Sequence, residues 1–453
     1  MIGSLTLEQA RAITGGVRRG ADVSFNAVST DTRSLQQGEL FVALKGATFD
    51  GNAFVASAQQ GGACAALLGA EVATALPTLH VADTCSALGQ LAHANRCQSH
   101  ATVIGLTGSQ GKTSVKEMTT AILAQAGAVH ATRGNLNNAI GVPLTLLQIT
   151  AQHRFAVIEM GANAPGEIGY LTRLVEPDLA LITNIAPTHL EGFGSLSGVA
   201  AAKAELWQGL RGDGRAIVNL DDMNIPRQVR VQSGQKLVGI SACGQSHAVY
   251  GVDAIEDQGL EGSQFSVWTP RGKARLHLAL PGRHNVANAL AALALAMEAG
   301  ATLAQVERGL ADLRGVQGRL MVQAGRGGAT VIDDSYNASP ASFKAAIDLL
   351  KALPGTRIVV AGDMGELGTQ QQAAHEQLGA YAQDAGIDLF MGTGELTRLA
   401  VRAFGTKGLF APDWQALAAA VLPFLAPEVT VLVKGSRSAK MERVVKQLLS
   451  EGA

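Results

Sequence analysis

Short, unbroken apolar runs alternate with longer amphipathic segments through the middle of this chain. Strands without polar alternation are typical of parallel sheets whose two faces are both covered by helices. The pattern therefore predicts such a sheet between about residues 101 and 313. Its expected strands are Val103–Leu106, Phe155–Ile158, Leu179–Thr183 and Ala216–Asn219.

A second alternating series begins at about residue 314 and predicts a separate doubly wound domain. Helical segments such as Pro340–Leu353 and Ala373–Asp384 separate its strands. The expected strands are Thr330–Asp333, Arg357–Ala361, Leu389–Met391 and Val429–Val433.

The remaining segments do not follow this alternation. Residues 1 to about 100 mix short strands with helices, and Leu40–Leu44 is the clearest strand, after a turn at Gln36–Glu39. Cys97–His100 is the expected linker to the next domain. Residues 248–280 have the pattern of antiparallel strands, and Pro281–Asn285 then opens a helix rich in alanine and leucine.

With 453 residues, the chain is too long for one hydrophobic core. We therefore expect an α/β protein of three domains. Residues 1–100 would form a mixed α/β domain, residues 101–313 a central domain with a mostly parallel sheet, and residues 314–453 a doubly wound, Rossmann-like domain.

Composition narrows the classes of function. A net charge of −1 argues against a polyanionic partner, so we expect no nucleic acid. No apolar run reaches transmembrane length and no secretory signal opens the chain, so we expect a cytoplasmic protein with no membrane partner. The cysteines have no metal or redox spacing, and we interpret them as reduced core thiols. They are Cys64, Cys85, Cys97 and Cys243.

The strongest chemical signal is Gly105–Thr113, which connects the apolar strand Thr102–Leu106 to an expected helix from Lys112 to about Gln125. Backbone N–H groups in such a turn hold phosphates, the lysine reaches the outer phosphates and the threonine hydroxyl holds Mg²⁺. The usual motif has a glycine where this chain has Leu106, so a ligand-free strand-to-helix turn is the alternative. The phosphate loop predicts an ATPase-type central domain. The candidate nucleotide ligands in it are Gly108, Ser109, Gln110, Gly111, Lys112 and Thr113.

Two polar residues follow strands of the same predicted sheet, where ligands of open α/β sheets bind. Glu159 comes directly after Phe155–Ile158, and its carboxylate could reach Mg²⁺ held by Thr113. The alternative is a loop acid that caps the next helix. His189 lies just past the strand that ends at Thr183, as either a ligand or a solvated loop side chain.

Lys203 lies at helical spacing with three apolar residues, Val199, Leu206 and Leu210. A lysine on an apolar face either has a chemical role or extends its charged end to water. The sequence leaves both interpretations open.

Asparagines mark two further candidate positions. Asn135, Asn137 and Asn138 precede Ile140–Pro143, and such a run suits either turns or a polar substrate loop. Asn285 either caps its helix or contacts a nucleotide base.

Together these segments resemble one family, the Mur ligases of bacterial cell-wall synthesis. The phosphate loop, including its displaced first glycine, is similar to theirs. The chain is most similar to the branch that adds a D-alanyl-D-alanine dipeptide, and it lacks the Asp-Asn-Pro-Arg tetrapeptide of the diaminopimelate-adding branch. The matching segments span all three expected domains. They are Ser29–Arg33, Phe49–Gly51, Asn135–Pro143, Glu159–Asn163, Pro165–Ile168, His189–Gly194, Asp334–Pro340, Gly362–Gly368 and Lys434–Arg437.

The resemblance implies roles for the central residues. Thr113 and Glu159 would hold a Mg²⁺ that bridges the ATP phosphates, and His189 would hold a second Mg²⁺. Lys203 would be carbamylated, because CO₂ converts its cation into an anion that binds metal. Lys112, His189 and Lys203 are thus the implied catalytic residues.

The resemblance also implies how the three domains share the ligands. Residues 1–100 would bind the UDP-sugar-peptide, and residues 314–453 would bind the incoming dipeptide and close on ATP. Arg437 is the candidate for the dipeptide carboxylate, because a guanidinium fork fits that group; a surface arginine at a helix start is the alternative. The implied nucleotide contacts are Asn285, Arg319, Asp334, Tyr336 and Asn337. The implied substrate contacts are Ser29, Arg33, Lys45, Asn135, Asn138, Lys434, Ser436 and Arg437.

The implied reaction joins the terminal carboxylate of UDP-MurNAc-tripeptide to the amine of D-Ala-D-Ala. It would pass through an acyl phosphate and give UDP-MurNAc-pentapeptide, ADP and phosphate. A GTPase is disfavoured because the chain has no Asn-Lys dipeptide, and Ser29–Arg33 and Glu159–Asn163 favour this reaction over that of folylpolyglutamate synthase, a related amide ligase. The resemblance further implies a monomer whose domains close to exclude water.

Overall fold

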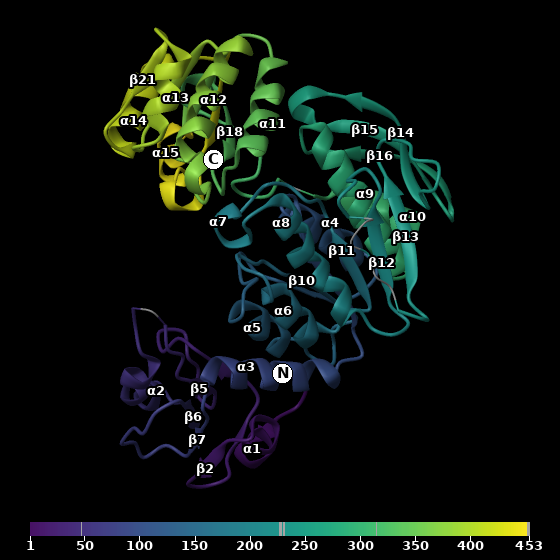
Figure 1. The fold of residues 1–453 in the computed structure, drawn as a ribbon, viewed down its shortest axis with the longest axis vertical. Helices are drawn as coiled ribbons and strands as arrows, with labels where there is room; N and C mark the ends of the chain where they lie inside the picture. The colour runs from purple at the N-terminus through teal and green to yellow at the C-terminus, as the bar shows by residue number, and fades with distance from the viewer. Residues whose placement is uncertain (47, 226–228, 230–231, 314, 451–453) are drawn as a thin grey trace.

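The computed structural model describes residues 1–46, 48–225, 229, 232–313 and 315–450. Three bodies follow one another along the longest axis of the molecule, in the order of the sequence (Figure 1). Each body contains its own larger β-sheet, and the sheets have five, nine and six strands. The α/β class expected from the sequence is confirmed.

The first body has a five-stranded sheet in the order β2-β7-β6-β5-β4. Strands β4 to β7 are parallel, and β2 joins the edge antiparallel. The strands are β2 (Val17–Arg19), β4 (Val28–Ser29), β5 (Leu40–Val42), β6 (Ala65–Leu68) and β7 (Thr78–His80), with β1 (Leu5–Thr6) and β3 (Ser24–Phe25) paired separately. The helices are α1 (Leu7–Thr14), α2 (Val55–Gln60) and α3 (Thr84–Cys97).

Helix α3 joins this body to the next one. Its buried Leu88 and Leu91 belong to the same apolar cluster as Leu146 and Leu174 of the central body. Arg96, only 2% exposed, donates hydrogen bonds across the junction to the backbone carbonyl oxygens of residues 175 and 176. The first body is therefore fixed to the central one by buried apolar and polar contacts rather than by the linker alone.

The central sheet has the order β16-β15-β14-β13-β12-β11-β8-β10-β9. It is parallel from β9 to β14, and two antiparallel hairpin pairings then add β15 and β16 at one edge. The strands are β8 (Thr102–Thr107), β9 (Val129–Ala131), β10 (Phe155–Glu159), β11 (Leu179–Ile182), β12 (Arg215–Asn219), β13 (Lys236–Ser241), β14 (Tyr250–Asp257), β15 (Ser263–Thr269) and β16 (Gly272–Leu278).

Both faces of the central sheet are buried, which explains the unbroken apolar runs. On β8, Val103 belongs to the cluster on one face, whereas its neighbour Ile104 belongs to the cluster on the other. The first face is covered by α5 (Gly141–Leu147), α6 (Glu167–Val175) and α8 (Leu196–Ala204). The second is covered by α4 (Lys112–Ala124), α9 (Arg283–Glu298) and α10 (Leu303–Ala311).

The third body has a doubly wound sheet in the order β17-β18-β22-β19-β20-β21, parallel except for β17. One face packs against α11 (Pro340–Lys351), α12 (Gln371–Asp384) and α13 (Thr397–Phe404). The other packs against α14 (Trp414–Val421) and α15 (Glu442–Leu448). The strands are β17 (Met321–Ala324), β18 (Thr330–Asp334), β19 (Thr356–Ala361), β20 (Leu389–Gly392), β21 (Gly408–Phe410) and β22 (Val429–Lys434).

Three local predictions were wrong. The cysteines are free but not core residues: Cys97 and Cys243 are exposed and Cys64 and Cys85 half-buried, because they lie at the ends of elements. The linker begins one residue later than expected, since α3 includes Cys97. The helix that carries Lys203 does not continue to residue 210, because a 3₁₀ turn, Glu205–Gly209, follows α8.

Candidate active site

The phosphate loop joins β8 to α4 at the centre of the nine-stranded sheet. Gly111 has φ +76° and precedes the first residue of α4, a conformation that favours glycine. Gly108 has φ +154°, and a Cβ there would collide with the hydroxyl of Thr183. Leu106, where the usual motif has glycine, is instead a fully buried strand residue. The displaced glycine thus reflects a strand that continues further into the loop.

Asn184, which sequence reasoning overlooked, holds this loop in shape. Its backbone oxygen accepts from the N–H of Ser109 at 2.9 Å, and its side-chain oxygen accepts from the N–H of Gln110 at 2.9 Å. The hydroxyl of Thr183 donates to the carbonyl oxygen of Gln110 at 2.5 Å. Both residues directly follow β11, and a polar pair at a strand end beside the phosphate loop was the signal available in the sequence.

The structure brings Thr113, Glu159, Asn137 and Arg319 together. The Thr113 hydroxyl donates to a carboxylate oxygen of Glu159 at 3.1 Å, and the Asn137 amide donates to the other oxygen at 2.8 Å. Arg319 of the third body donates to the Thr113 hydroxyl at 3.1 Å. Glu159 is 2% exposed at the end of β10, so it does not cap the next helix from solvent. A buried carboxylate beside a loop threonine is a donor set that suits Mg²⁺.

The amine of Lys112 lies against the loop itself and donates to the carbonyl oxygen of Gly108 at 2.7 Å. Burial lowers the pKa of Lys112, although the nearby Glu159 carboxylate opposes that shift and Arg319 adds to it. Anionic phosphates would reverse the effect by favouring the charged amine. The N–H at Nε of Arg319 is buried and has no hydrogen-bond partner among the described residues. Both cations are therefore placed to meet an anionic ligand at the loop.

His189 has φ +51° and directly precedes α7 (Leu190–Phe193). Helix α7 lies on the side of the central body that faces the third body (Figure 1). Its Nδ1 lies 2.7 Å from a carboxylate oxygen of Glu366, a residue of the third body. The hydrogen bond from His189 lowers the pKa of Glu366. This contact makes the His189 loop part of the boundary between the two bodies.

Lys203 is 1% exposed, and both it and His189 lie near Phe193. The two side chains flank the ring of Phe193: Nζ of Lys203 is 5.9 Å from the ring centroid, and the His189 ring is 6.4 Å from it. Burial, with a smaller effect of Lys112, lowers the pKa of Lys203 to about 7. Lys203 has no hydrogen-bond or ion-pair partner in the described part of the chain, so this buried residue has no counter-ion there.

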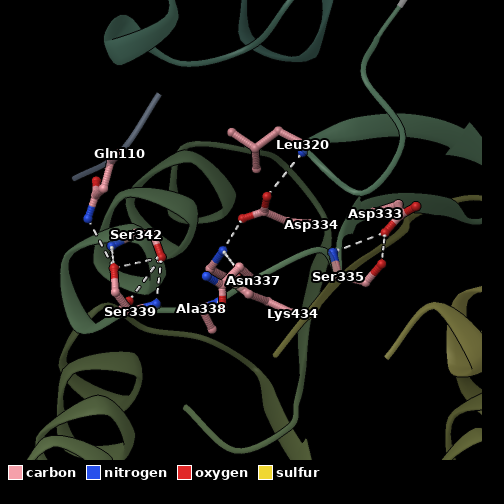
Figure 2. A network of polar contacts seen from close by, with 10 residues as sticks. All are labelled: Gln110, Leu320, Asp333, Asp334, Ser335, Asn337, Ala338, Ser339, Ser342 and Lys434. Carbon is pink, nitrogen blue, oxygen red and sulfur yellow. Dashed lines mark hydrogen bonds and ion pairs between the residues drawn. The ribbon is translucent and has the colours of Figure 1, made fainter. Parts of the chain in front are cut away.

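The third body contributes a polar network around Asp334, at the end of β18 (Figure 2). The amine of Lys434, 2% exposed, lies 2.6 Å from the Asp334 carboxylate and donates to the carbonyl oxygen of Asn337 at 2.9 Å. Gln110 of the phosphate loop donates to the hydroxyl of Ser339, the residue that caps α11, at 3.0 Å. Lys434, expected at the dipeptide, is thus already engaged by its own domain.

Two arginines of the third body contact the ring of Tyr336. The guanidinium of Arg319 lies 4.3 Å from the ring centroid and that of Arg437 lies 5.8 Å from it. The Arg437 side chain is 62% exposed, and its ion pair with Glu442 is long, at 3.4 Å. It therefore keeps most of its donors available.

The proposal that Asn285 caps its helix was wrong. Helix α9 begins at Arg283 after Gly282, so Asn285 lies inside the first turn. Its amide donates to the carbonyl oxygen of Pro281 at 2.8 Å, and its side-chain oxygen accepts from Asn288 at 3.2 Å. The first turn of α9 therefore has no side-chain cap among the described residues.

A cavity of about 990 Å³ is lined by residues of all three bodies, although Thr113 and Lys203 are not among them. The central body supplies the phosphate loop, Glu159, His189, Asn285 and the Asn135–Asn138 loop, in which Asn138 accepts from the N–H of Gly141. The third body supplies Arg319, Asp334, Tyr336, Asn337, Lys434 and Arg437. A volume of this size accommodates a nucleotide together with part of a second substrate.

The residues expected to bind the UDP-sugar-peptide lie elsewhere. Ser29, Arg33 and Lys45 belong to the first body, and none of them lines the cavity. Ser29 donates to the backbone of Asp31, and Arg33, with its side chain 88% exposed, pairs with the Asp31 carboxylate at 2.6 Å. The first body contributes Cys85, on α3, to the cavity lining. A ligand that reaches both places must extend from one body to the next.

The described residues contain no group of three His, Cys, Asp or Glu side chains arranged to hold a metal ion. No helix of the described chain is both long and apolar enough to cross a membrane.

Comparison with known families assigns all three bodies. The family models described as "Mur ligase family, catalytic domain", "Mur ligase middle domain" and "Mur ligase, glutamate ligase domain" match residues 24–96, 106–296 and 318–437. The chain belongs to the Mur ligase family.

Individual Mur ligases resemble it over their full length. The UDP-N-acetylmuramoyl-tripeptide--D-alanyl-D-alanine ligase of Escherichia coli strain K12 is 46% identical, with 99% of each chain covered. Among solved structures, MurF from Acinetobacter baumannii has a TM-score of 0.89 at 33% identity and covers 99% of each chain. MurF from Thermotoga maritima, solved in complex with ADP, has a TM-score of 0.80 at 27% identity, covering 93% of this chain and 96% of that one.

Proposed function

We propose that this Mur ligase joins D-Ala-D-Ala to UDP-MurNAc-tripeptide at the expense of ATP, forming UDP-MurNAc-pentapeptide, ADP and phosphate. The observation that carries the proposal is the cavity lined by Lys112 and Glu159 of the central body and by Arg319 of the third body. Arg319 also donates to the hydroxyl of Thr113, which contacts Glu159. The relative from Escherichia coli is named for this activity, and the similarity covers 99% of its length. The product is a precursor of peptidoglycan.

The phosphate loop binds ATP in this proposal. Backbone N–H groups of residues 108–111 and the start of α4 would face the phosphates, and Lys112 would leave the carbonyl oxygen of Gly108 for the outer phosphates. The buried, unpartnered Nε of Arg319 fits the same anion from the opposite side. Asn285, Tyr336 and Asn337 line the cavity where the nucleoside would lie.

Thr113 and Glu159 fit one Mg²⁺, because a hydroxyl and a buried carboxylate already touch there. His189 and Lys203 flank the ring of Phe193 and fit a second ion only if Lys203 is carbamylated. With its pKa at about 7, Lys203 is partly neutral at physiological pH, and the neutral amine is the form that reacts with CO₂. When bound, the two ions would neutralise the phosphate charge and the negative charge that develops in phosphoryl transfer.

The chain's own residues then activate a poor acylating agent. The tripeptide carboxylate attacks the γ-phosphorus of ATP, giving an acyl phosphate and ADP, and the amine of the dipeptide displaces phosphate from the acyl carbon. Lys112 and Arg319 offset the repulsion between the carboxylate and the phosphates. The Gln110–Ser339 hydrogen bond links the third body to the phosphate loop, and closure of the two bodies there would exclude water from the acyl phosphate.

The first and third bodies divide the remaining recognition. Ser29, Arg33 and Lys45 would hold the UDP-sugar end, and Asn135 and Asn138 the peptide that extends into the cavity. Lys434, Ser436 and Arg437 would face the dipeptide, and Lys434 also contacts Asp334 and Asn337. We propose a cytoplasmic monomer that takes no nucleic acid or membrane partner.

A coupled assay tests this function. The purified protein is incubated with ATP, UDP-MurNAc-tripeptide and D-Ala-D-Ala, each omitted in turn, and phosphate release is followed. We expect release only when all three are present. Release that is supported by a folate and glutamate instead would refute the proposal.

A further inference from the structure

The acidic side chains that line the cavity differ in how they are engaged. Four of the five have partners within their own body: Glu159, Glu167, Asp221 and Asp334. The fifth, Glu366, pairs with His189 of the other body, and the side chain of Glu366 is 58% exposed. Glu366 is therefore the cavity carboxylate with the most capacity left for a ligand.

Glu366 lies at the tip of a loop, residues 362–368, that is fixed at two consecutive positions. The Asp363 carboxylate accepts hydrogen bonds from the N–H and the hydroxyl of Thr397, at 2.7 and 2.6 Å. The N–H of Met364 donates to Nε2 of His375 at 2.9 Å. Glu366 itself has φ +63°, a conformation that an L-residue adopts only when its surroundings impose it.

His375 is fully buried on α12, and its ring is fixed by its two partners. Nδ1 lies 2.6 Å from the carbonyl oxygen of Gln371, so Nδ1 must carry the hydrogen and Nε2 must be the acceptor for Met364. The hydrogen-bond partners of His375, Met364 and Gln371, do not line the cavity. Its effect on the cavity is therefore indirect, through the conformation of the loop that carries Glu366.

The loop lies beside the segment that carries Arg437. The N–H of Ser436 donates to the carbonyl oxygen of Asp363 at 2.9 Å, so a negative and a positive side chain project from two loops that are hydrogen-bonded together. Both line the cavity. A zwitterion of two residues has this distribution of charge, with an ammonium at one end and a carboxylate at the other.

The rest of the cavity disfavours an ammonium ion. Lys112, Arg319 and Arg437 line it with positive charge that suits phosphates and carboxylates. An α-amine with a pKa of about 8 arrives mostly protonated at neutral pH. It needs an anionic partner near the phosphate loop, and the charge of Glu366 acts on Lys112 of that loop.

We propose that Glu366 receives the ammonium group of the incoming dipeptide while Arg437 receives its carboxylate, and that His375 is a positioning residue for Glu366. This inference rests on the proposed function. It adds to the dipeptide site a residue that recognises the amine. The positive charge of the incoming dipeptide would then help to determine which substrates bind.

The test compares Glu366→Gln with Glu376→Gln, the same change at an exposed residue of α12. In the ligase assay, the KM for D-Ala-D-Ala should rise ~10- to 100-fold in Glu366→Gln, the loss expected for one charge-assisted hydrogen bond. The KM values for ATP and UDP-MurNAc-tripeptide should stay unchanged, and Glu376→Gln should behave as the parent. An unchanged KM for the dipeptide, or equal rises for all three substrates, would overturn the proposal.

A neutral acceptor separates charge recognition from a general disturbance of His189. D-lactoyl-D-alanine carries a hydroxyl in place of the ammonium, and it is measured as a competitive inhibitor against D-Ala-D-Ala. The parent should bind it far more weakly than the dipeptide, and Glu366→Gln should bind the two about equally. Retention of the parent's preference would overturn the role of Glu366.

His375 is tested by the same preference. His375→Leu should lower the preference for the ammonium ligand, and His375→Gln should restore part of it, because an amide oxygen can again accept from Met364. Loss of folding or of turnover alone, with the preference unchanged, would exclude the positioning role. If the parent protein releases phosphate without D-Ala-D-Ala, both the proposed function and this inference fail. If the parent requires D-Ala-D-Ala but Glu366→Gln behaves in the same way as the parent, the inference alone fails.

Discussion

Lys203→Met should make the protein more stable and inactive at once. Lys203 is 1% exposed, and desolvation lowers its pKa from 10.5 to about 7. At a pH between these two pKa values, the amine is protonated in the unfolded chain but not in the folded chain. The free energy of unfolding therefore falls as the pH falls from about 10 to 7. At pH 7 the accumulated cost is about 4 kcal/mol. Methionine fills similar space without a charge, so the variant should recover much of this free energy of unfolding.

The assay is urea unfolding at pH 7 in CO₂-free buffer, which keeps the amine unmodified. Unfolding is followed by tryptophan emission, to which Trp207, buried on the turn after α8, contributes. Lys236→Met, at an exposed position of β13, is the matched control and should not change stability. A Lys203→Met variant that is less stable than the parent would refute the argument that the amine is buried at a cost.

The ligase activity of variants at position 203 tests the carbamate separately. Lys203→Ala should lose most ligase activity, and bicarbonate or short carboxylic acids should restore part of it by supplying the missing anion. Full activity of Lys203→Ala would remove the carbamate from the account, whatever its stability.

Three further outcomes follow from the structure. Asp334→Asn leaves the buried amine of Lys434 without its counter-ion and should lower the stability of the third body by about 3 kcal/mol in urea unfolding. Burial lowers the pKa of His130 to about 4, so stability should fall by up to about 3 kcal/mol as the pH falls from 6.5 to 4. His130→Gln should flatten that part of the profile. Gly108→Ala forces a Cβ onto Thr183, and displacement of the phosphate loop should lower kcat/KM for ATP ~100-fold.

Matched controls keep these outcomes specific. Asp384→Asn and His277→Gln change exposed side chains and should leave stability and its pH profile unchanged. Gly212→Ala meets no atom within 4 Å and should keep full activity. Equal losses in a control and its partner variant would refute the corresponding argument.

Much of the fold could be predicted because burial leaves a direct trace in the sequence. The core strands β8, β10, β11 and β12 are apolar on both faces, and Val103 and Ile104 indeed pack on opposite sides of the sheet. Strand β13 was missed because its exposed Lys236 and Leu237 and its Gly239 break the run. Element ends also shifted by a residue or two, where local hydrogen bonds decide.

In the candidate site, too, features set by the local sequence could be predicted, whereas contacts between the bodies could not. The phosphate loop and Glu159 depend on local chain geometry, and the sequence placed both at strand ends. The contacts between bodies depend on how separate sheets pack, which no local pattern records. Arg319 contacts Thr113, which is 206 residues away in the sequence, and Glu366 contacts His189, which is 177 residues away. Only the resemblance to a family suggested the first of these contacts.

The central claim is that the tripeptide carboxylate is activated by phosphorylation in the shared cavity. UDP-MurNAc-tripeptide labelled with ¹⁸O in its terminal carboxylate is incubated with the protein, ATP and D-Ala-D-Ala, and the phosphate is analysed by mass spectrometry. The account predicts one ¹⁸O atom in each phosphate released, because the carboxylate oxygen that attacks the γ-phosphorus leaves with it. Phosphate without label, formed alongside the pentapeptide product, would contradict the account.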